Sequence, residues 1–295
     1  MNWKSVLFTI FCGVIATKSF AQANLLNAKT PEEIGKPTEA QVVLNNDKPL
    51  PYGYVDDRDI LWSKTVWEKI DLNERVNFPL YFPVDTVGIG SDRRSLFNVL
   101  MKGIKENKIK IYADSYFTEK RQLSDIEATL SKIDTTDLGV EQLNAGEQVS
   151  KEYINVRNIS AADIEQYWIK GVWYFDKRQG ELKYRLLGIA PVAPDVNFID
   201  TEQSDLVPLF WVWYPSAREV LHKAKAFNDE NSARPISFDH LLNSRRFNGI
   251  IFKEDNVYGD RKIDDYIHQN ALFQLLESER IKEKIRDKEM DMWSY

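Results

Sequence analysis

Cysteine is almost absent from this chain of 295 residues, because its only cysteine is Cys12. Disulfides and cysteine-based zinc sites are therefore excluded for everything that follows Cys12. Histidine is scarce too: the only three are His222, His240 and His268, and none lies within a helical turn of another. Because a metal site needs several convergent ligands, we expect no metal and no cofactor.

An excess of basic residues is also missing. The chain has 39 Lys and Arg against 45 Asp and Glu, a formal net charge of -6. Affinity for nucleic acid comes largely from Lys and Arg that displace counterions, so a nucleic-acid partner is not expected. No internal apolar run approaches the roughly 20 residues of a membrane helix. We expect a soluble folded protein whose partners are proteins, small molecules or sugars.

The first residues have the pattern of an export signal. A short basic start is followed by the apolar run from Val6 to Ala16 and by Ser19-Phe20-Ala21, with small residues at the two positions that signal peptidase reads. The bulky Phe11 before Cys12 argues against a lipoprotein site. We expect residues 1–21 to be a signal peptide cleaved after Ala21 and the mature protein to be periplasmic.

The remaining sequence predicts an α+β fold, with mixed helices and antiparallel strands in two lobes. Four prolines interrupt the polar stretch before residue 57, and the stretch 131–152 is polar without a period. The expected segments are an extended proline-containing arm (22–56), an N-terminal αβ lobe (57–130), a linker (131–152), a C-terminal αβ lobe (153–262) and a long C-terminal helix (263–295).

Periodicity predicts individual elements within these segments. Ile60, Trp67 and Ile70 at helical intervals indicate an amphipathic helix between residues 57 and 71. Two β-rich runs, 169–176 and 181–192, predict a hairpin. Further expected elements are a helix carrying Leu96 to Ile104, a strand over 109–112, an apolar strand over 206–214, helices opening at Ser216 and Ser237, and a strand over 249–252.

The expected C-terminal helix has two apolar sides. Ile281 and Ile285 fall on one side, whereas Leu272, Leu275 and Leu276 fall on the other. Its middle is therefore expected to be enclosed by more than one surface. Charges three residues apart predict supporting ion pairs along the helix, between Glu277 and Arg280, Glu279 and Lys282, and Glu283 and Arg286.

Three patterns occur twice in the same order, which raises the hypothesis of a weak internal duplication. One of them is Pro79-Leu80-Tyr81-Phe82, which returns as Pro208-Leu209-Phe210-Trp211. Trp62-x-Lys64-x-Val66-Trp67 returns as Trp168-x-Lys170-x-Val172-Trp173, and the helix and strand over 97–111 match those over 238–252. Against this hypothesis, the first tryptophan pattern reads as helix and the second as strand. The alternative is that part of the correspondence is chance.

No arrangement of catalytic residues stands out. Serine never occurs in a G-x-S-x-G elbow, which excludes the commonest hydrolase arrangement. Asp195 and Asp200 could serve as the acid and base of a glycosidase, but solvated loop acids are the interpretation that we favour. We therefore expect a protein that is not an enzyme.

Aromatic residues are abundant instead. Trp211-Val212-Trp213-Tyr214 places large rings on alternating faces of one strand. Core packing, an intersubunit surface and a sugar-stacking platform each explain such rings. The candidate interface residues are Tyr52, Tyr54, Trp62, Trp67, Trp211, Trp213, Leu275, Leu276, Ile281 and Ile285.

Several longer motifs together resemble one known family. They are Pro51-Tyr52-x-Tyr54, Asp59-Ile60-x-Trp62, Ile70-Asp71-Leu72, Asn77-x-Pro79-Leu80-Tyr81-x-Pro83, Lys170-x-x-Trp173-x-Phe175-Asp176, Gly188-Ile189-Ala190-Pro191 and Leu209-Phe210-Trp211-Val212-Trp213-Tyr214-Pro215. Through them the chain resembles the GldN family, called PorN in some members, of Bacteroidota gliding motility and type IX secretion. The resemblance extends over nearly all of the chain after the signal peptide.

This resemblance implies a non-enzymatic periplasmic subunit. It implies self-assembly with the outer-membrane lipoprotein GldK into a large oligomeric ring, contact with the inner-membrane motor proteins GldL and GldM, and a role in protein export and gliding. No catalytic residue is implied. The alternative function is a periplasmic carbohydrate- or peptidoglycan-binding protein, for which coplanar, solvent-facing Trp rings are expected; a hydrolase would instead show a pocket with convergent acids or histidines.

Overall fold

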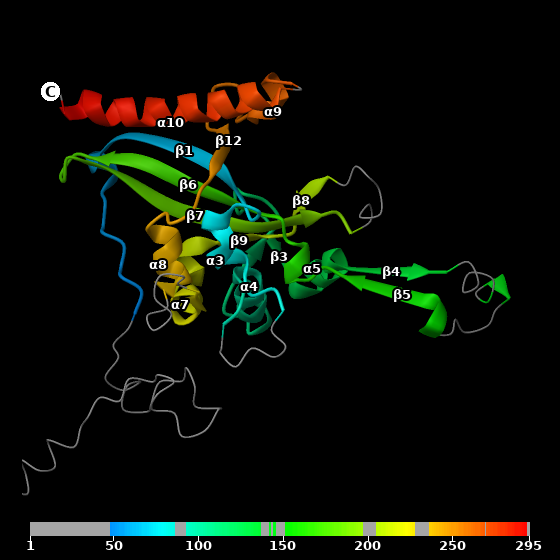
Figure 1. Ribbon diagram of the computed structural model, residues 1–295. Helices are drawn as coiled ribbons and strands as arrows, with labels where there is room; N and C mark the ends of the chain where they lie inside the picture. Colours follow the sequence, from blue (N-terminus) through cyan, green and yellow to red (C-terminus); the bar gives the residue numbers. More distant parts are fainter. Residues whose placement is uncertain are drawn as a thin grey trace, which may run out of the picture. The chain divides into compact units, whose positions relative to one another are not determined.

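The computed structural model describes residues 48–85, 93–136, 142, 144–145, 151–196, 205–227, 236–268 and 270–293 (Figure 1). All helices and strands named below belong to one compact unit formed by residues 49–86 and 93–295. The expected signal peptide and residues 22–47 of the expected arm lie outside the described residues.

An antiparallel sheet forms the centre of this unit. In the described part of the chain it has eight strands in the order β12-β1-β6-β7-β9-β2-β3, and β8 also pairs with β7. The strands are β1 (Ile60–Asp71), β2 (Ile111–Tyr112), β3 (Lys120–Arg121), β6 (Gln166–Asp176), β7 (Glu181–Pro194), β8 (Leu206–Pro208), β9 (Trp211–Trp213) and β12 (Ile250–Glu254). Two short ladders are separate from it, β4 (Ser131–Thr135) with β5 (Ile154–Asn158) and β10 (Lys225–Ala226) with β11 (Ile236–Ser237).

Helices complete the α+β class that the sequence predicts. They are α3 (Phe78–Tyr81), α4 (Leu96–Lys105), α5 (Leu123–Leu130), α7 (Tyr214–Lys223), α8 (Phe238–Asn243), α9 (Ile263–Tyr266) and α10 (Ala271–Trp293). Short 3-10 turns cover Asp57–Asp59, Arg75–Asn77, Lys151–Tyr153 and Ala161–Asp163. The side chain of Ser237 caps α8 by accepting a hydrogen bond from the backbone N–H of His240, as expected for a helix that opens there.

The predicted hairpin is confirmed, but the predicted helix before it is wrong. β6 and β7 pair along their length around the turn at 177–180, where Gly180 has a φ of +66° that favours glycine. Residues 60–71, expected to be helical, form strand β1 between β12 and β6. Val66, Trp67 and Glu68 are all buried, so both faces of β1 are covered and its sequence lacks the alternation that marks a strand.

Strands from both expected lobes join in the same sheet. β1 comes from the expected N-terminal lobe, and it pairs with β6 and β12 from the expected C-terminal lobe. Strand β4 lies within the expected linker and pairs with β5.

The tryptophan patterns of the suggested duplication occupy neighbouring strands. The first lies in β1 and the second in β6, and these strands pair directly. The objection that the first copy is helical therefore disappears. The matched helix–strand segments end in β2 and β12, which belong to the same sheet but pair with different strands.

Two separate apolar cores hold helices against the sheet. The larger includes the fully buried Tyr167, Tyr214, Phe210 and Phe238 and receives residues of α4, α7 and α8. The smaller consists of Val66, Ile251, Ile263, Ile281 and Ile285, and it holds α9 and α10. Figure 1 shows α10 running alongside β1 and β12, with α4, α7 and α8 on the other side of the strands in that view.

The C-terminal helix is interrupted near its start. Sequence periodicity predicts one helix from Ile263, whereas α9 ends at Tyr266 and α10 begins at Ala271. Asn270 explains the new start, because its side-chain Oδ1 accepts a hydrogen bond from the backbone N–H of Phe273 at 3.1 Å. The three predicted ion pairs along α10 are confirmed.

Helix α10 also closes one edge of the sheet. The backbone N–H of Ile251 in β12 donates a hydrogen bond of 2.9 Å to the hydroxyl of Ser278. Ser278 is fully buried. A backbone donor on the edge strand is thereby satisfied by a side chain of the helix instead of by another strand.

Candidate protein-interaction site

The first turns of α10 carry an exposed group of large apolar side chains. Leu272, Phe273, Leu275 and Leu276 are 65%, 56%, 42% and 54% exposed. We call these four residues the α10 apolar surface. Contiguous exposed apolar side chains usually mark a place where another molecule binds, because leaving them in water is unfavourable.

The geometry of α10 explains why these residues are exposed. Ile281 and Ile285 are buried in the smaller core, which orients the helix. Side chains on the opposite face, Leu272, Leu275 and Leu276, then point away from the sheet. The expectation that a second surface encloses this part of the helix is not met within the described chain.

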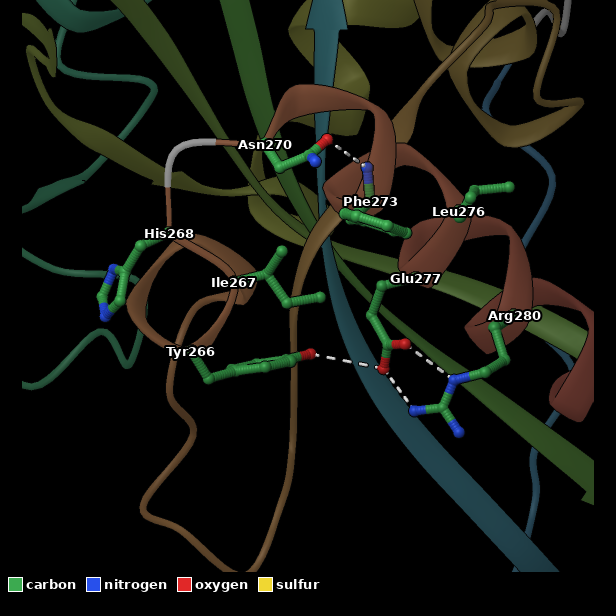
Figure 2. A pocket seen from close by; sticks show the side chains of 8 residues that line it. All are labelled: Tyr266, Ile267, His268, Asn270, Phe273, Leu276, Glu277 and Arg280. Atoms are coloured by element: carbon green, nitrogen blue, oxygen red, sulfur yellow. Dashed lines mark hydrogen bonds and ion pairs between the residues drawn. The ribbon is translucent and has the colours of Figure 1, made fainter.

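An open hollow of about 620 Å³ lies between α9 and the start of α10 (Figure 2). Phe273 and Leu276 line it together with Tyr266, Glu277 and Arg280. Figure 2 shows the Tyr266 hydroxyl and the Arg280 guanidinium converging on the carboxylate of Glu277. The apolar surface is thus continuous with a partly polar hollow.

The polar groups of the hollow bind one another. Arg280 Nε donates to Glu277 Oε2 at 2.7 Å, and the Tyr266 hydroxyl donates to Glu277 Oε1 at 3.5 Å. The hydrogen bond from Arg280 lowers the pKa of Glu277 below its usual value. Burial, and then the nearby Glu277, raises the pKa of Tyr266 to about 12. At neutral pH the carboxylate is therefore charged and engaged, which suits a fixed surface and not proton transfer.

The lowered pKa of Glu277 gives a pH prediction for the docking of α10. A carboxyl group whose pKa is lower in the folded state stabilises that state above the ordinary value of 4.5, and the stabilisation is lost as the pH falls through the lowered pKa. We expect hydrogen-exchange protection of the Ile251 amide, which is bonded to Ser278, to decrease over that acidic range. In Glu277→Gln this part of the pH dependence should vanish; an identical profile in both proteins would contradict the assignment.

The structure separates the ten candidate interface residues into three groups. Tyr54, Leu275 and Leu276 are exposed. Tyr52, Trp62 and Trp213 are half-buried. Trp67, Trp211, Ile281 and Ile285 are buried inside the chain. The buried four pack in the fold, so only the first two groups offer surface to a partner.

Tyr52 holds the start of the described chain against the fold. Its hydroxyl donates to Asn243 Oδ1 at 3.1 Å, and its ring lies beneath the guanidinium groups of Arg218 and Arg185, 4.1 and 4.8 Å from the ring centre. Arg185 also donates to the carbonyl of Gly53 at 3.0 Å. These contacts fix residues 52 and 53, whereas Tyr54 is 82% exposed.

Sequence reasoning missed Phe273 as part of this surface and placed Leu272 beneath a covering surface. Their hydrophobicity was visible, but nothing in the sequence says which apolar side of a helix is covered. The signal that could have identified them is the Asn270 cap, because a helix that starts there extends beyond the core contacts of Ile281 and Ile285.

The described residues contain no group of three or more His, Cys, Asp or Glu that could hold a metal ion. Asp200 of the suggested acid–base pair lies outside them. Among the helices in the described ranges, none is long and apolar enough to cross a membrane.

Comparison with known proteins connects this structure to one family. A search of curated proteins found no match to the chain. The model of the family described as gliding motility associated protein GldN matches residues 55–294. This match includes the whole sheet and α10 up to its last residue. The chain therefore belongs to the GldN family of gliding-motility-associated proteins.

Proposed function

We propose that this protein is a non-enzymatic structural subunit of the periplasmic ring of the type IX secretion and gliding machinery. In this role it assembles with copies of itself and with a GldK-type outer-membrane lipoprotein, contacts GldL- and GldM-type inner-membrane motor proteins, and supports protein export and gliding. It resides in the periplasm and associates with the outer membrane through the lipoprotein.

The observation that carries this proposal is the α10 apolar surface. Leu272, Leu275 and Leu276 project from the face of α10 opposite the buried Ile281 and Ile285, and the exposed Phe273 beside them lines the hollow. A rigid, preformed apolar face is what a protein partner can bind at low entropic cost. We assign the lipoprotein to this surface, with a second copy of the chain as the competing outcome.

We expect Leu275→Glu/Leu276→Glu to disrupt assembly without unfolding the chain. Both side chains are exposed, so the monomer should melt within a few degrees of wild type. Charges placed in an apolar interface cost about 2 kcal/mol or more, so lipoprotein retained in a pull-down should fall by at least about tenfold. Negative-stain microscopy of the co-expressed proteins should show loss of rings.

Met290→Glu is the matched control, because Met290 is 59% exposed on the same helix. Normal lipoprotein binding by the double variant would refute the assignment. If lipoprotein binding were normal but self-association were lost, the surface would instead bind a second copy of the chain. Deleting everything after Leu276 is a poorer test, because it also removes Ile281 and Ile285 from the smaller core.

The carbohydrate-binding alternative is less well supported by ring geometry. The half-buried Trp168 and Phe252 have ring centres 4.9 Å apart, but their planes are inclined by 43°. Trp213 meets Phe117 edge-on, at 79°. Neither pair forms the coplanar platform that stacking on a sugar requires.

A further inference from the structure

A row of basic and aromatic residues, with one glycine between two of them, crosses the sheet. Lys253 of β12 lies opposite Trp67 of β1, which lies opposite Lys170 of β6; Lys170 lies opposite Gly188 of β7, and Gly188 lies opposite Trp213 of β9. Residues paired in this way share one face of a sheet. We call these five residues the basic–aromatic row.

The loop between β2 and β3 is anchored on this row. Phe117 fills the space above Gly188, where an added Cβ would lie only 2.5 Å from the Phe117 ring. The Tyr116 ring lies 5.9 Å from the ring of Trp67. Gly188 is therefore needed for the loop to approach the sheet this closely. The loop places the ring of Tyr116 close to Lys170 and Lys253, and the ring of Phe117 close to Lys170.

Both lysine ammonium groups lie against these rings. Lys170 Nζ is 4.9 Å from the centre of Trp67 and 4.6 Å from that of Tyr116. Lys253 Nζ is 4.4 and 5.1 Å from the same two rings. Two positive charges thus share one aromatic pair, and each remains attracted to the ring faces.

Hydrogen bonding leaves these cations with unused donors. Lys170 donates to the carbonyl of Ser115 at 3.0 Å, and Lys253 donates to the Tyr116 hydroxyl at 3.0 Å. An ammonium group has three donors. Among the residues that the structure describes, neither ammonium has a carboxylate within ion-pair distance, and the buried indole N–H of Trp67 has no hydrogen-bond partner.

The nearest carboxylates are already engaged by other groups. Asp114 accepts hydrogen bonds from the Thr118 hydroxyl and from the backbone N–H of Tyr116. Asp260 accepts from the Tyr116 hydroxyl and the Asn256 backbone N–H. Burial lowers the pKa of Lys170, and the neighbouring Lys253 lowers it further; burial is also the main cause that lowers the pKa of Lys253.

We propose that the two partly exposed lysines of the basic–aromatic row, Lys170 and Lys253, bind an acidic segment of a protein partner by receiving one or two of its carboxylates. The partner's carboxylates would accept hydrogen bonds from the unused ammonium donors, and its apolar atoms would contact Trp168 and Phe252 beside the row. Lys262 extends the same surface, because its Nζ lies 5.6 Å from the ring centre of Trp168. These residues differ from those of the α10 apolar surface, so the two proposals can fail separately.

Charge complementarity selects an acidic occupant, and ring geometry favours a peptide over a sugar. The neighbouring rings of Trp168 and Phe252 are inclined to each other, which suits the irregular surface of a polypeptide. The whole chain is acidic, with a formal net charge of -6, so an acidic partner is attracted only where lysines are concentrated.

Binding of poly-L-glutamate to the full-length exported chain tests the proposal, with polygalacturonate as an acidic glycan of similar charge. Trp fluorescence reports binding, because Trp67 lies against both lysines. In Lys170→Gln/Lys253→Gln we expect affinity for poly-L-glutamate to fall by about tenfold or more. The matched control is Lys102→Gln/Lys105→Gln, which removes two exposed charges from α4 and should leave binding unchanged.

Three outcomes would overturn the proposal: no binding to the wild-type chain, equal losses in both double variants, or equal affinity for the two polymers. The last outcome would mean that charge alone is recognised. Thermal melting checks the fold of each variant. If the double variant does not fold, Lys253→Gln alone should still weaken binding several-fold, and an unchanged affinity would refute the role of the row.

Discussion

Arg245→Met is expected to destabilise the fold by about 3–5 kcal/mol, because it leaves a buried negative charge without a partner. Glu68 on β1 is 1% exposed. Its two carboxylate oxygens accept hydrogen bonds from the two terminal nitrogens of Arg245, at 3.1 and 2.7 Å. Burial is the largest single influence on the pKa of Arg245 and lowers it, yet the attraction and hydrogen bonds of Glu68, with a further contribution from Tyr184, together raise the pKa of the guanidinium. Removing the arginine leaves the carboxylate without its partner and without water.

Urea denaturation should measure this loss, and a second substitution provides the control. In Glu68→Leu/Arg245→Met both charges are replaced by apolar side chains, so much of the lost stability should return, because removing both partners of a buried pair leaves no unpaired charge. A single Arg245→Met that costs less than about 1 kcal/mol would mean that water or another group reaches Glu68.

Trp211→Ala should cost about 3–5 kcal/mol, the usual penalty for removing a large ring from a core. Trp211 is 4% exposed and packs in a cluster with Trp67 and Ala190. Trp213 is half-buried and contacts Phe117 edge-on, with ring centres 4.8 Å apart. Trp213→Ala should therefore cost less, about 1–2 kcal/mol.

Thermal and chemical unfolding of the purified variants would test this order. Tyr54→Ala is the control, because Tyr54 is largely exposed and its loss should change stability by no more than about 0.5 kcal/mol. Unchanged melting of Trp211→Ala together with lost assembly would show that the ring acts in an interface and not in the fold.

The sequence predicts those elements whose own residues determine them. The β6–β7 hairpin has a short glycine turn between two β-rich runs, and α8 has its Ser237 cap, so both could be foreseen. β1 could not, because its character depends on neighbours far along the chain. Glu68 lies in the segment that periodicity assigns to a helix, and only the tertiary structure shows that it is paired with Arg245, 177 positions further along the chain.

The interaction surfaces follow the same rule. Periodicity identifies two apolar sides on the C-terminal helix, but only the tertiary structure shows that Ile281 is covered and Leu276 is not. The basic–aromatic row was invisible in the sequence, because Lys253, Trp67 and Lys170 come from three strands and meet only through strand register. The interaction surfaces could not be predicted because they depend on contacts between residues far apart along the chain, and not because secondary-structure propensities are weak.

The hydrogen bond between Ile251 and Ser278 has a consequence for how copies of this protein can meet. With this part of the β12 edge held by a helix, and with the opposite edge strand β3 reduced to Lys120 and Arg121, both ends of the sheet resist recruitment into a continuous cross-chain ladder. Pairing of edge strands from different copies, which could continue from copy to copy without limit, is therefore disfavoured. Contact between copies at these two edges must then rely on side chains, so individual residues determine its geometry and its extent.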